Sequence, residues 1–398
     1  MNILMLSPTF PRPLNKGSRI RIYHSLRVLS REHHITLLSL LHDEPEAEHR
    51  QNVASICDDV RTVSGIRGRT HAAIRALLTG EPYRVAKFHF ESYRRALHTL
   101  LEDRDFDLLW VHFLNMLSFL KEERFDARVI LDQHNADQLM WRKLAENASM
   151  FHSLFARMNI SMLQEFRATH TSLVDRVLSV SEEDASFTRS QYQPEVEVDV
   201  VPNGVDLTQF STSGEVEMTD PVRLLFCGSM DVQMNVDAVR RFARDVFPDL
   251  RDRLNKVRFD IVGRDPVPEV ISLADHTGVN VTGTVDDVLP YYRRADVMVA
   301  PFQYGGGTKL KILEALAARV PVVSTEVGVQ GIDVRDGQHV LVARKLSSFA
   351  DQVTELTDHP GLRRRLVENG YDLVAEKYSW DSIYGNALTG ITKRKSKS

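Results

Sequence analysis

The sequence is poor in cysteine and has no long apolar run. Only Cys57 and Cys227 occur among 398 residues, so at most one disulfide can form and a disulfide-stapled secreted scaffold is excluded. No uninterrupted apolar stretch approaches the roughly 20 residues that a transmembrane helix needs. The apolar start MNILMLSP is short and lacks a basic region, which favours a buried strand over a signal peptide. We therefore expect a cytoplasmic protein.

The sequence also lacks a large excess of either charge. The 50 Lys and Arg residues and 54 Asp and Glu residues leave a net charge of −4. This balance argues against binding of nucleic acid by the whole protein, because such binding usually needs a basic surface. The hydrophobic content of 43% is enough for large cores and excludes general disorder.

Short apolar runs alternate with longer amphipathic segments along the whole chain. The first set of expected strands is 3–6, 35–41, 108–111, 129–131 and 177–180, with helices at 19–31, 84–101, 138–146 and 151–173. The second set of strands is 222–226, 259–262, 279–282, 297–300, 322–324 and 340–342, with helices at 236–247, 270–276, 288–294, 310–319, 349–356 and 362–377. Apolar strands alternating with helices indicate parallel sheets covered on both faces. The predicted fold class is α/β, with two Rossmann-like, doubly wound parallel-sheet domains facing a cleft.

A linker separates the two sets of strands. Residues 201–206 contain Pro and Gly, and the polar stretch 211–220 follows them. We expect an N-terminal domain at 1–205 and a C-terminal domain at 206–379, with a last helix at about 380–398 packing back on the first domain. Ligands of open α/β sheets bind at the carboxyl ends of strands, so the functional residues should follow strands.

The strongest local signal is the stretch PFQYGGGTKLKILE at 301–314, which follows the expected strand 297–300. Its triple glycine, 305–307, lets backbone N–H groups approach an anion without obstruction by a Cβ atom. Thr308 is expected to cap the helix that begins there. A helix N-terminus carries free N–H donors and partial positive charge, so this stretch predicts a phosphate site.

Two lysines stand in the first turn of the same helix. Lys309 and Lys311 oppose the helix dipole there, an arrangement that makes sense if a phosphate lies among them. Glu314 lies one turn beyond, where its carboxylate could bind a ribose diol. The spacing fits neither G-x-G-x-x-G nor a P-loop, which weakens interpretations as a dehydrogenase, a kinase or a P-loop NTPase. A Gly-rich turn with solvated lysines is the alternative.

This stretch resembles the donor-site loop and helix of retaining GT-B glycosyltransferases of family GT4, the glycosyltransferase group 1 family. The resemblance extends to SPTFPRP at 7–13 with Gly17 to Arg19, to FCGSMD at 226–231 with Asn235, and to VTGTV at 281–285. It implies that a sugar moves from a nucleoside diphosphate sugar to the hydroxyl of a glycan, lipid-linked or small-molecule acceptor. It also implies retention of the anomeric configuration, no metal and no other cofactor.

The resemblance implies a role for each matching residue. Lys309 and Lys311 would neutralise the diphosphate, and Glu314 would hold the ribose hydroxyls. The donor-binding residues that it implies are Gly17, Gly228, Gly283, Thr284, Val285, Gly306, Gly307, Thr308 and Glu314, and the acceptor-side residues are Ser18, Arg19 and Asn135.

The sequence departs from the family pattern at three positions. Ser229 and Asn235 stand where many relatives have basic residues, so neutralisation of the diphosphate should rest on the lysines at 309 and 311. Gly306 stands where many relatives have a glutamate that contacts the transferred sugar. This last departure keeps a catalytically silent sugar-nucleotide-binding protein open as an alternative.

A histidine follows the expected strand 129–131. His134 stands where relatives often place a histidine near the transferred sugar, and as a catalytic residue it could hydrogen-bond that sugar or polarise developing charge. Asn135 is a weaker companion, and Asp132 is expected to cap a turn. A structural histidine is the alternative, because the chain has 15 of them.

Residues 61–95 are locally basic and interleaved with apolar side chains. This segment could dock on an anionic membrane at the inner face, or on a lipid-linked acceptor. A solvated helical face is the alternative. A GT-B sugar-nucleotide epimerase remains a second enzymatic alternative, whereas a glycoside hydrolase would need a pair of carboxylates that does not stand out here.

Overall fold

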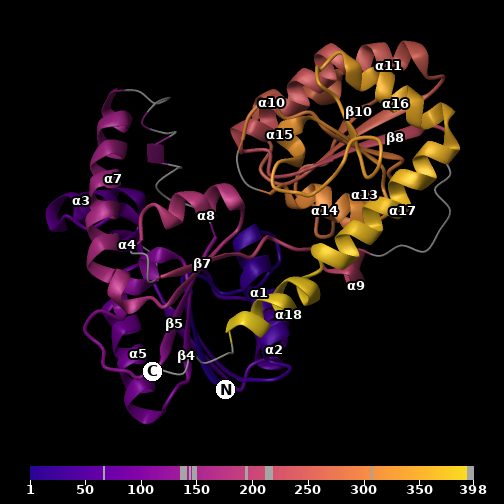
Figure 1. Cartoon of the computed structure of the whole chain (residues 1–398). Coiled ribbons are helices and arrows are strands. Elements are labelled where there is room, and N and C mark those ends of the chain that lie inside the picture. Colours follow the sequence, from indigo (N-terminus) through magenta and orange to yellow (C-terminus); the bar gives the residue numbers. More distant parts are fainter. Residues whose placement is uncertain are drawn as a thin grey trace. The chain divides into compact units, whose positions relative to one another are not determined.

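The computed structural model describes the chain except for residues 66–67, 135–140, 143–144, 146–149, 193–195, 211–217, 306–307 and 392–398. It has two compact units. Unit 1 is Met1–Pro202 together with the chain from Ala387 onward, and unit 2 is Asn203–Asn386. Each unit is a parallel sheet with helices on both faces (Figure 1).

The sheet of unit 1 has seven parallel strands in the order β3-β2-β1-β4-β5-β6-β7. The strands are β1 (Asn2–Ser7), β2 (His34–Leu41), β3 (Asp59–Ser64), β4 (Leu108–His112), β5 (Arg128–Gln133), β6 (Arg176–Ser179) and β7 (Glu197–Val200). The helices are α1 (Gly17–Leu29), α2 (Ala47–Ala54), α3 (Arg69–Thr79), α4 (Tyr83–Phe88), α5 (Glu91–Asp103), η1 (Leu114–Phe119), α7 (Met150–His170), η2 (Thr171–Leu173) and α8 (Glu182–Arg189). Each strand expected for this half overlaps an observed one, and β3 and β7 are additional.

One face of this sheet forms an apolar core with α4, α5 and α7. Leu4, Leu38 and Val111 from the strands are buried there with Tyr93 of α5 and Leu163 of α7. The opposite face packs on α1. Alternate strand residues therefore serve two different cores, which is why the central strands are apolar almost throughout.

The structure corrects the expectation of one helix over 84–101. Two helices, α4 and α5, occupy this range, and Phe90 between them has an extended backbone with φ −127° and ψ 129°. The break places aromatic side chains against the core: the ring of His89 stacks on Phe119 at 5.5 Å between centroids. The helix expected at 138–146 lies mostly outside the described residues.

The sheet of unit 2 has six parallel strands in the order β10-β9-β8-β11-β12-β13. The strands are β8 (Val222–Cys227), β9 (Val257–Val262), β10 (Val279–Val281), β11 (Val297–Ala300), β12 (Val322–Ser324) and β13 (Leu341–Val342). The helices are α9 (Leu207–Phe210), α10 (Gln233–Arg241), η3 (Phe242–Val246), α11 (Phe247–Arg253), α12 (Pro268–Ile271), η4 (Ser272–Asp275), α13 (Leu289–Arg293), α14 (Leu310–Ala317), α15 (Glu326–Val329), α16 (Ser348–Asp358) and α17 (Pro360–Lys377). The last helix, α18 (Trp380–Ile391), begins in unit 2 and ends in unit 1.

The helix expected at 236–247 begins earlier and is not uniform. It starts at Gln233, contains a π-helical turn at Phe242–Val246 and continues into α11. Pro248 explains the irregular turn, because proline has no backbone N–H to bond the preceding turn of an α-helix. The helix expected at 270–276 is likewise divided into α12 and the 3₁₀ turn η4.

Each sheet has one point where the strand order reverses. In unit 1 it lies between β1 and β4, and in unit 2 between β8 and β11. Loops that leave two such strands run in opposite directions, and the crevice between them is the usual ligand site of open α/β sheets. We therefore expect ligand-binding residues directly after these four strands.

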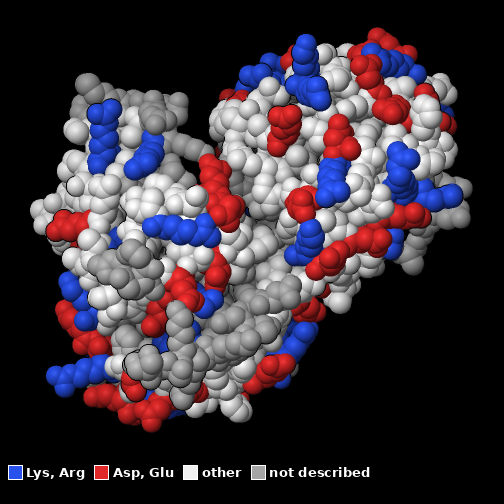
Figure 2. Space-filling model, viewed as in Figure 1, with Lys and Arg blue, Asp and Glu red and all other residues white. Residues whose placement is uncertain are grey.

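Acidic and basic side chains are interspersed over the face that Figure 2 shows, in both units. Among the described residues, no helix combines the length and apolar character needed to cross a membrane.

Candidate functional site

Two glycines bring backbones close together at the carboxyl ends of β8 and β9, next to the reversal point of unit 2. The N–H of Gly228, directly after β8, donates to the carbonyl of Val262 at 2.9 Å. A Cβ atom on Gly263, directly after β9, would lie 1.6 Å from the carbonyl oxygen of Gly228. Only glycine fits at 263, so the loops that leave β8 and β9 are held in fixed contact.

The side chain of Lys311 lies beneath this pair of loops. Its ammonium, carried by the second residue of α14, donates to Oδ1 of Asn235 at 2.9 Å. The amide of Asn235 in turn donates to the carbonyl of Ser229 at 2.8 Å. A Cβ atom on Gly228 would lie 2.6 Å from the ammonium nitrogen. The glycine therefore leaves room for the cation at the carboxyl end of β8.

Two aromatic rings complete the surroundings of this ammonium. It lies 4.2 Å from the ring centroid of Phe226 and 4.9 Å from that of Phe302, within the range of cation–π attraction. Burial lowers the pKa of Lys311 to about 7, and the nearby Lys309 lowers it as well, although the Glu314 carboxylate acts in the opposite direction. An anion bound beside Lys311 would restore its full charge.

The structure corrects the expected cap of α14. Lys309, and not Thr308, is the N-cap residue. The hydroxyl of Thr308 has no hydrogen-bond partner among the described residues, and it lies 3.0 Å from the position of a Cβ atom on Gly331. The side chain of Lys309 is buried, with its ammonium 5.8 Å from the Phe302 ring.

Gly305 is the described member of the triple glycine. Its φ of 133° is one that side-chain-bearing residues rarely adopt, and a Cβ atom there would lie 2.7 Å from the sulfur of Met234. Gly306 and Gly307, both expected in the donor site, lie outside the described residues.

Glu314 lies on α14 one turn after Lys311. Its carboxylate accepts a hydrogen bond from the hydroxyl of Tyr292 at 2.8 Å, and burial raises its pKa. Burial also raises the pKa of the neighbouring Cys227 thiol to about 12, so this cysteine is an unreactive core residue. Sequence reasoning missed Tyr292, because its partner lies on another helix and no local pattern connects the two.

The expected base-binding turn follows β10 at the same carboxyl edge. Gly283 has a φ of 70°, and the hydroxyl of Thr282 donates to its carbonyl at 2.9 Å. Thr284 is exposed and Val285 is half-buried. The structure thus places Gly228, Gly283 and the lysines on one edge of one sheet, with the base-binding role of the turn still a prediction.

A second group of polar side chains lies at the reversal point of unit 1. His112 and Asp132 are register partners at the ends of β4 and β5. The carboxylate of Asp132 is fully buried and is held by Arg21 of α1, whose Nε lies 2.9 Å from Oδ1 and whose Nη2 lies 2.7 Å from the same oxygen. Asp132 was expected to cap a turn; it is instead the anion of a buried ion pair.

His134 joins this group directly after β5. Its Nε2 lies 3.1 Å from Nδ1 of His112 and 3.9 Å from Oδ2 of Asp132. Its ring packs on Phe113 at 4.1 Å between centroids. Sequence reasoning found His134 but missed Arg21 and His112, which are distant in sequence and become neighbours only through the strand order.

The N-terminal loop residues lie at the start of α1. Gly17 is the first residue of the helix and is exposed, after Lys16 as the N-cap. Ser18 and Arg19 are half-buried, and the Arg19 guanidinium donates to Oδ1 of Asn15 at 3.2 Å. Asn135, expected on the acceptor side, lies outside the described residues.

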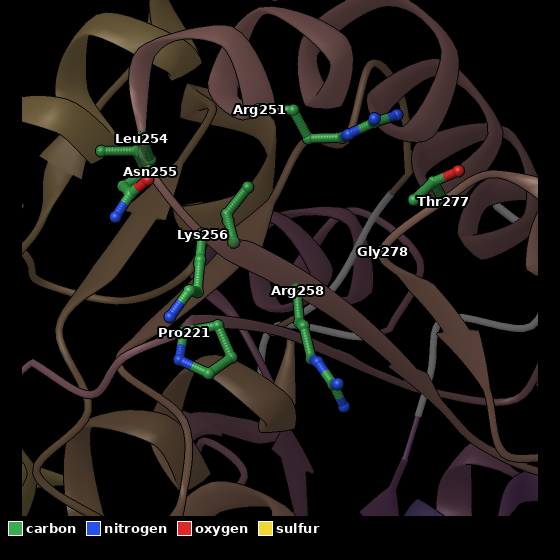
Figure 3. Close-up of a pocket in the computed structure, with 9 residues that line it drawn as sticks. Pro221, Arg251, Leu254, Asn255, Lys256, Arg258, Thr277 and Gly278 are labelled. Carbon is green, nitrogen blue, oxygen red and sulfur yellow. The ribbon is translucent and has the colours of Figure 1, made fainter.

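A pocket of about 460 Å³ opens elsewhere in unit 2 (Figure 3). It is lined by Pro221, Arg251, Leu254, Asn255, Lys256, Val257, Arg258, Thr277 and Gly278. These residues surround the amino-terminal ends of β8, β9 and β10, the edge opposite Gly228 and Gly283. Its basic side chains are not those of the expected donor site.

Two doubly wound parallel sheets in one chain are the architecture of the GT-B fold. Comparison with known proteins identifies the family. Residues 16–209 match the model described as "Glycosyltransferase Family 4", and residues 221–359 match "Glycosyl transferases group 1". The chain belongs to the glycosyltransferase group 1, or GT4, family, whose members transfer a sugar from a nucleotide sugar.

Two curated relatives illustrate the match. The "Uncharacterized 44.6 kDa protein in cps region" of Klebsiella pneumoniae is 20% identical over 395 residues, which are 96% of this chain and 98% of the relative. A phosphatidyl-myo-inositol mannosyltransferase of Mycobacterium leprae is 28% identical over 193 residues, 46% of this chain and 50% of the relative.

Solved structures show the same fold over almost the whole chain. Sucrose-phosphate synthase of Thermosynechococcus elongatus has a TM-score of 0.68 at 15% identity, covering 98% of this chain and 99% of the other. WaaG, described as a glycosyltransferase involved in lipopolysaccharide biosynthesis, has a TM-score of 0.67 at 15% identity, covering 98% and 100%. HepE of Anabaena, solved with UDP and glucose, has a TM-score of 0.64 at 13% identity, covering 98% and 99%.

Proposed function

We propose that the protein is a retaining, metal-independent glycosyltransferase that binds the donor diphosphate at the carboxyl edge of the unit 2 sheet. The observation that carries this proposal is the ammonium of Lys311: the residue as a whole is half-buried, but its charged group is desolvated and is held by Asn235 at 2.9 Å beneath the Gly228 loop. A buried ammonium is costly unless an anion compensates it, and a diphosphate is such an anion. In this proposal residues 1–205 form the acceptor-side domain, and residues 206–379 form the donor-binding domain.

The chemistry needs stabilisation of the leaving diphosphate while the anomeric C–O bond breaks. Lys311, Lys309 and the amides at the start of α14 would supply it, because fixed charges and dipoles at developing charge are an effective source of catalysis. Glu314 would hold the ribose. His134 would hydrogen-bond the transferred sugar, and a donor phosphate oxygen would take the acceptor proton.

UDP-glucose is the first donor to test. Anabaena HepE was solved in complex with UDP-glucose, and this chain shares its fold. We expect UDP-, GDP- or TDP-sugars to raise the melting temperature of the protein in a thermal-shift panel. NMR of the product anomer with the selected donor would then show retention.

Lys311→Met tests the site, because it keeps most of the side-chain volume and removes the charge. We expect donor affinity to fall at least tenfold, since hydrogen bonds to charged groups contribute roughly 1.5–3 kcal/mol. Lys256→Met is the matched control: this lysine is exposed, pairs with Asp220 and lies at the opposite edge of the sheet. Native donor affinity in Lys311→Met would refute the site.

Two alternative functions give different results in the same assay. An epimerase would convert the donor sugar with no acceptor present. A silent binding partner would show the thermal shift but neither hydrolysis nor transfer with any acceptor. Retained transfer in the presence of a chelator supports the metal-independent proposal, and loss of activity on chelation contradicts it.

We further propose that the protein acts at the cytoplasmic face of an anionic membrane in glycan assembly. The exposed side of α3 carries Ile74, Leu77 and Leu78, which are 52%, 52% and 81% exposed. Their spacing of three and four residues puts them on one face of the helix. Arg84 and Lys87 follow within the segment 61–95. Such an apolar stripe beside basic residues fits a lipid surface.

Flotation with phosphatidylglycerol vesicles tests this membrane contact. We expect the native protein to float with the vesicles, and Leu77→Ser with Leu78→Ser to remain in the dense fractions. Ile271→Ser is the matched control, because Ile271 of unit 2 is also 52% exposed. No flotation of the native protein at moderate salt would remove the proposal without affecting the donor site.

A further inference from the structure

Four side chains form a continuous chain of contacts at the reversal point of unit 1. They are Arg21, Asp132, His112 and His134, and all four are buried. We propose that Asp132 and His112 are positioning residues that fix His134 in the neutral tautomer with its proton on Nδ1. This inference rests on the proposed function, because it assigns His134 the role of a hydrogen-bond donor to the transferred sugar.

The first step is the charge of Asp132. Burial alone would raise the pKa of this carboxyl group, but the Arg21 guanidinium beside it holds the pKa well below its usual range. Arg21 contacts both carboxylate oxygens, with Nε 2.9 Å from Oδ1 and 3.1 Å from Oδ2. Asp132 is therefore an anion at neutral pH.

The second step is the proton on His112. Its Nδ1 lies 3.4 Å from Oδ2 of Asp132 and 3.1 Å from Nε2 of His134, so both neighbours can accept from one N–H. A lone pair on Nδ1 would face the carboxylate and be repelled. On the other side of the ring, Nε2 lies 3.5 Å from the neutral hydroxyl of Ser25, which itself donates to the carbonyl of Ile22 at 2.8 Å. The charged acceptor outweighs the long neutral contact, which places the proton on Nδ1.

The third step is the tautomer of His134. Burial lowers its pKa well below the ordinary value for histidine, so the ring is neutral and carries one proton. Because Nε2 accepts from His112, that proton must be on Nδ1. The ring cannot turn easily, since it packs on Phe113, whose backbone N–H donates to the carbonyl of Asp132 at 3.1 Å.

As a consequence, His134 donates a hydrogen bond during the reaction and does not accept a proton. An Nδ1–H group can hydrogen-bond a sugar hydroxyl or an oxygen that gains negative charge. A neutral ring whose second nitrogen is already engaged is a poor general base. The network therefore fits retaining transfer, in which the acceptor proton leaves by another route.

The ring nitrogens of His112 and His134 and the carboxylate of Asp132 are close enough together to hold a metal ion. The experiment therefore has to distinguish a metal site from a hydrogen-bonded network. Arg21 argues for the hydrogen-bonded arrangement, because its positive charge already compensates Asp132. A divalent cation in the same place would lie beside a buried guanidinium.

The direct test is NMR of the full-length protein labelled with ¹⁵N-histidine. Long-range ¹H–¹⁵N correlations report which ring nitrogen carries the proton, and the signals are assigned by their loss in His112→Leu and His134→Gln. We expect the rings of His112 and His134 to carry their proton on Nδ1 between about pH 6 and about pH 8, the range of ordinary assays. A proton on Nε2 of His134 would overturn the inference, as would stoichiometric Zn²⁺ retained after dialysis against the metal.

Substitution at His112 tests the consequence for activity. In His112→Leu the carboxylate alone faces Nε2 of His134, so the proton should move to Nε2 and kcat should fall at least tenfold with little change in donor KM. His112→Asn keeps an N–H donor near the Nδ1 position and should restore both the tautomer and most of kcat. His98→Leu, on the exposed side of α5, is the matched control.

These outcomes separate this inference from the proposed function. If the native protein transfers no sugar, the proposed function fails, whereas the NMR measurement still decides the tautomer. If the native protein is active and His112→Leu retains native kcat, the positioning role is refuted. Should His112→Leu fail to fold, the contrast between His112→Asn and Asp132→Asn decides the matter, because only Asp132→Asn should move the proton of His134 to Nε2.

Discussion

At the scale of single residues, the ammonium of Lys311 is the group on which the proposed donor site depends most. It is enclosed by two aromatic rings and one amide oxygen, and burial lowers its pKa to about 7, so this group titrates near neutral pH. A bound diphosphate favours the charged form. Binding and protonation are therefore coupled at this lysine.

This coupling predicts a pH dependence with a definite sign. Below pH 7 Lys311 is already charged and donor affinity should be at its plateau. Above pH 7 each unit of pH should weaken binding by up to about tenfold, because the proton must be taken up on binding. Calorimetry with UDP-glucose between pH 6 and 9 measures this slope. Lys311→Met should bind weakly at every pH, with the slope removed; an unchanged slope would show that another group titrates.

A second prediction concerns Glu314, whose carboxylate accepts from Tyr292. Glu314→Gln keeps the side-chain shape and an oxygen for Tyr292 but replaces a charged acceptor with a neutral one. Hydrogen bonds to charged groups are worth more, so kcat/KM should fall roughly 10- to 100-fold. Tyr292→Phe is the comparison, since it removes the partner and leaves the carboxylate. Native kcat/KM in Glu314→Gln would exclude this residue from donor binding.

The sequence was informative about these residues only where the pattern was local. Lys309, Lys311 and Glu314 stand together on one helix turn after a recognisable strand, and His134 follows another strand. The partners that define their chemistry are remote. Asn235 lies 76 residues from Lys311, and Arg21 lies 111 residues from Asp132. No local period records such pairs, which arise from the order of strands in the sheet.

At the scale of helices and strands, apolar strands were predictable and polar strands were not. The strands at 297–300 and 322–324 occur with the expected bounds, because they are buried and all their residues but Ser324 are apolar. The strands β3 and β7 were missed, because DVRTVS and EVDV are half-exposed edge segments with polar residues. The single helix expected at 84–101 was wrong, since its apolar pattern continues across the aromatic residues at which the chain turns.

The contact of the β8 and β9 loops predicts that replacement of Gly263 by alanine destabilises the protein much more than replacement of Gly361. Gly263→Ala would place a Cβ atom 1.6 Å from the backbone oxygen of Gly228, so we expect a loss of at least about 3 kcal/mol in the free energy of unfolding. Gly361→Ala, near the start of α17 with nothing within 4 Å of the new atom, should be neutral or stabilising by up to about 1 kcal/mol. Urea denaturation of both variants measures the difference; equal stabilities would contradict the close approach.

At the scale of the whole molecule, the chain has two compact units, and the proposed diphosphate site around Lys311 lies in unit 2. A ligand that binds only the folded form of one unit stabilises that unit by mass action, by about 2.7 kcal/mol at a 100-fold excess over Kd. The three tryptophans report on the units separately. Trp110 and Trp141 belong to unit 1, and Trp380 belongs to unit 2.

When urea unfolding is followed by tryptophan fluorescence, UDP-glucose should therefore shift the unfolding transition of unit 2 more than that of unit 1. With Trp110 and Trp141 replaced by Phe, the transition reported by Trp380 should move to higher urea concentration when the donor is added. With Trp380 replaced by Phe, the transition of unit 1 should move less. An equal shift of both transitions would show that the two units unfold as one, and a shift confined to unit 1 would refute the donor site.

Arg21 makes two further hydrogen bonds, which determine where the chain can be truncated to produce unit 1 alone. Its Nη1 donates to the carbonyl of Val201 at 2.9 Å and to that of Pro202 at 3.0 Å, where unit 1 gives way to unit 2. Truncation before these carbonyls would strip a fully buried guanidinium of two acceptors, at a cost of about 1–3 kcal/mol or more. A fragment of the first half that stops at residue 199 would thus be destabilised around Arg21, Asp132 and the two histidines beside them. A stable fragment must extend through Pro202.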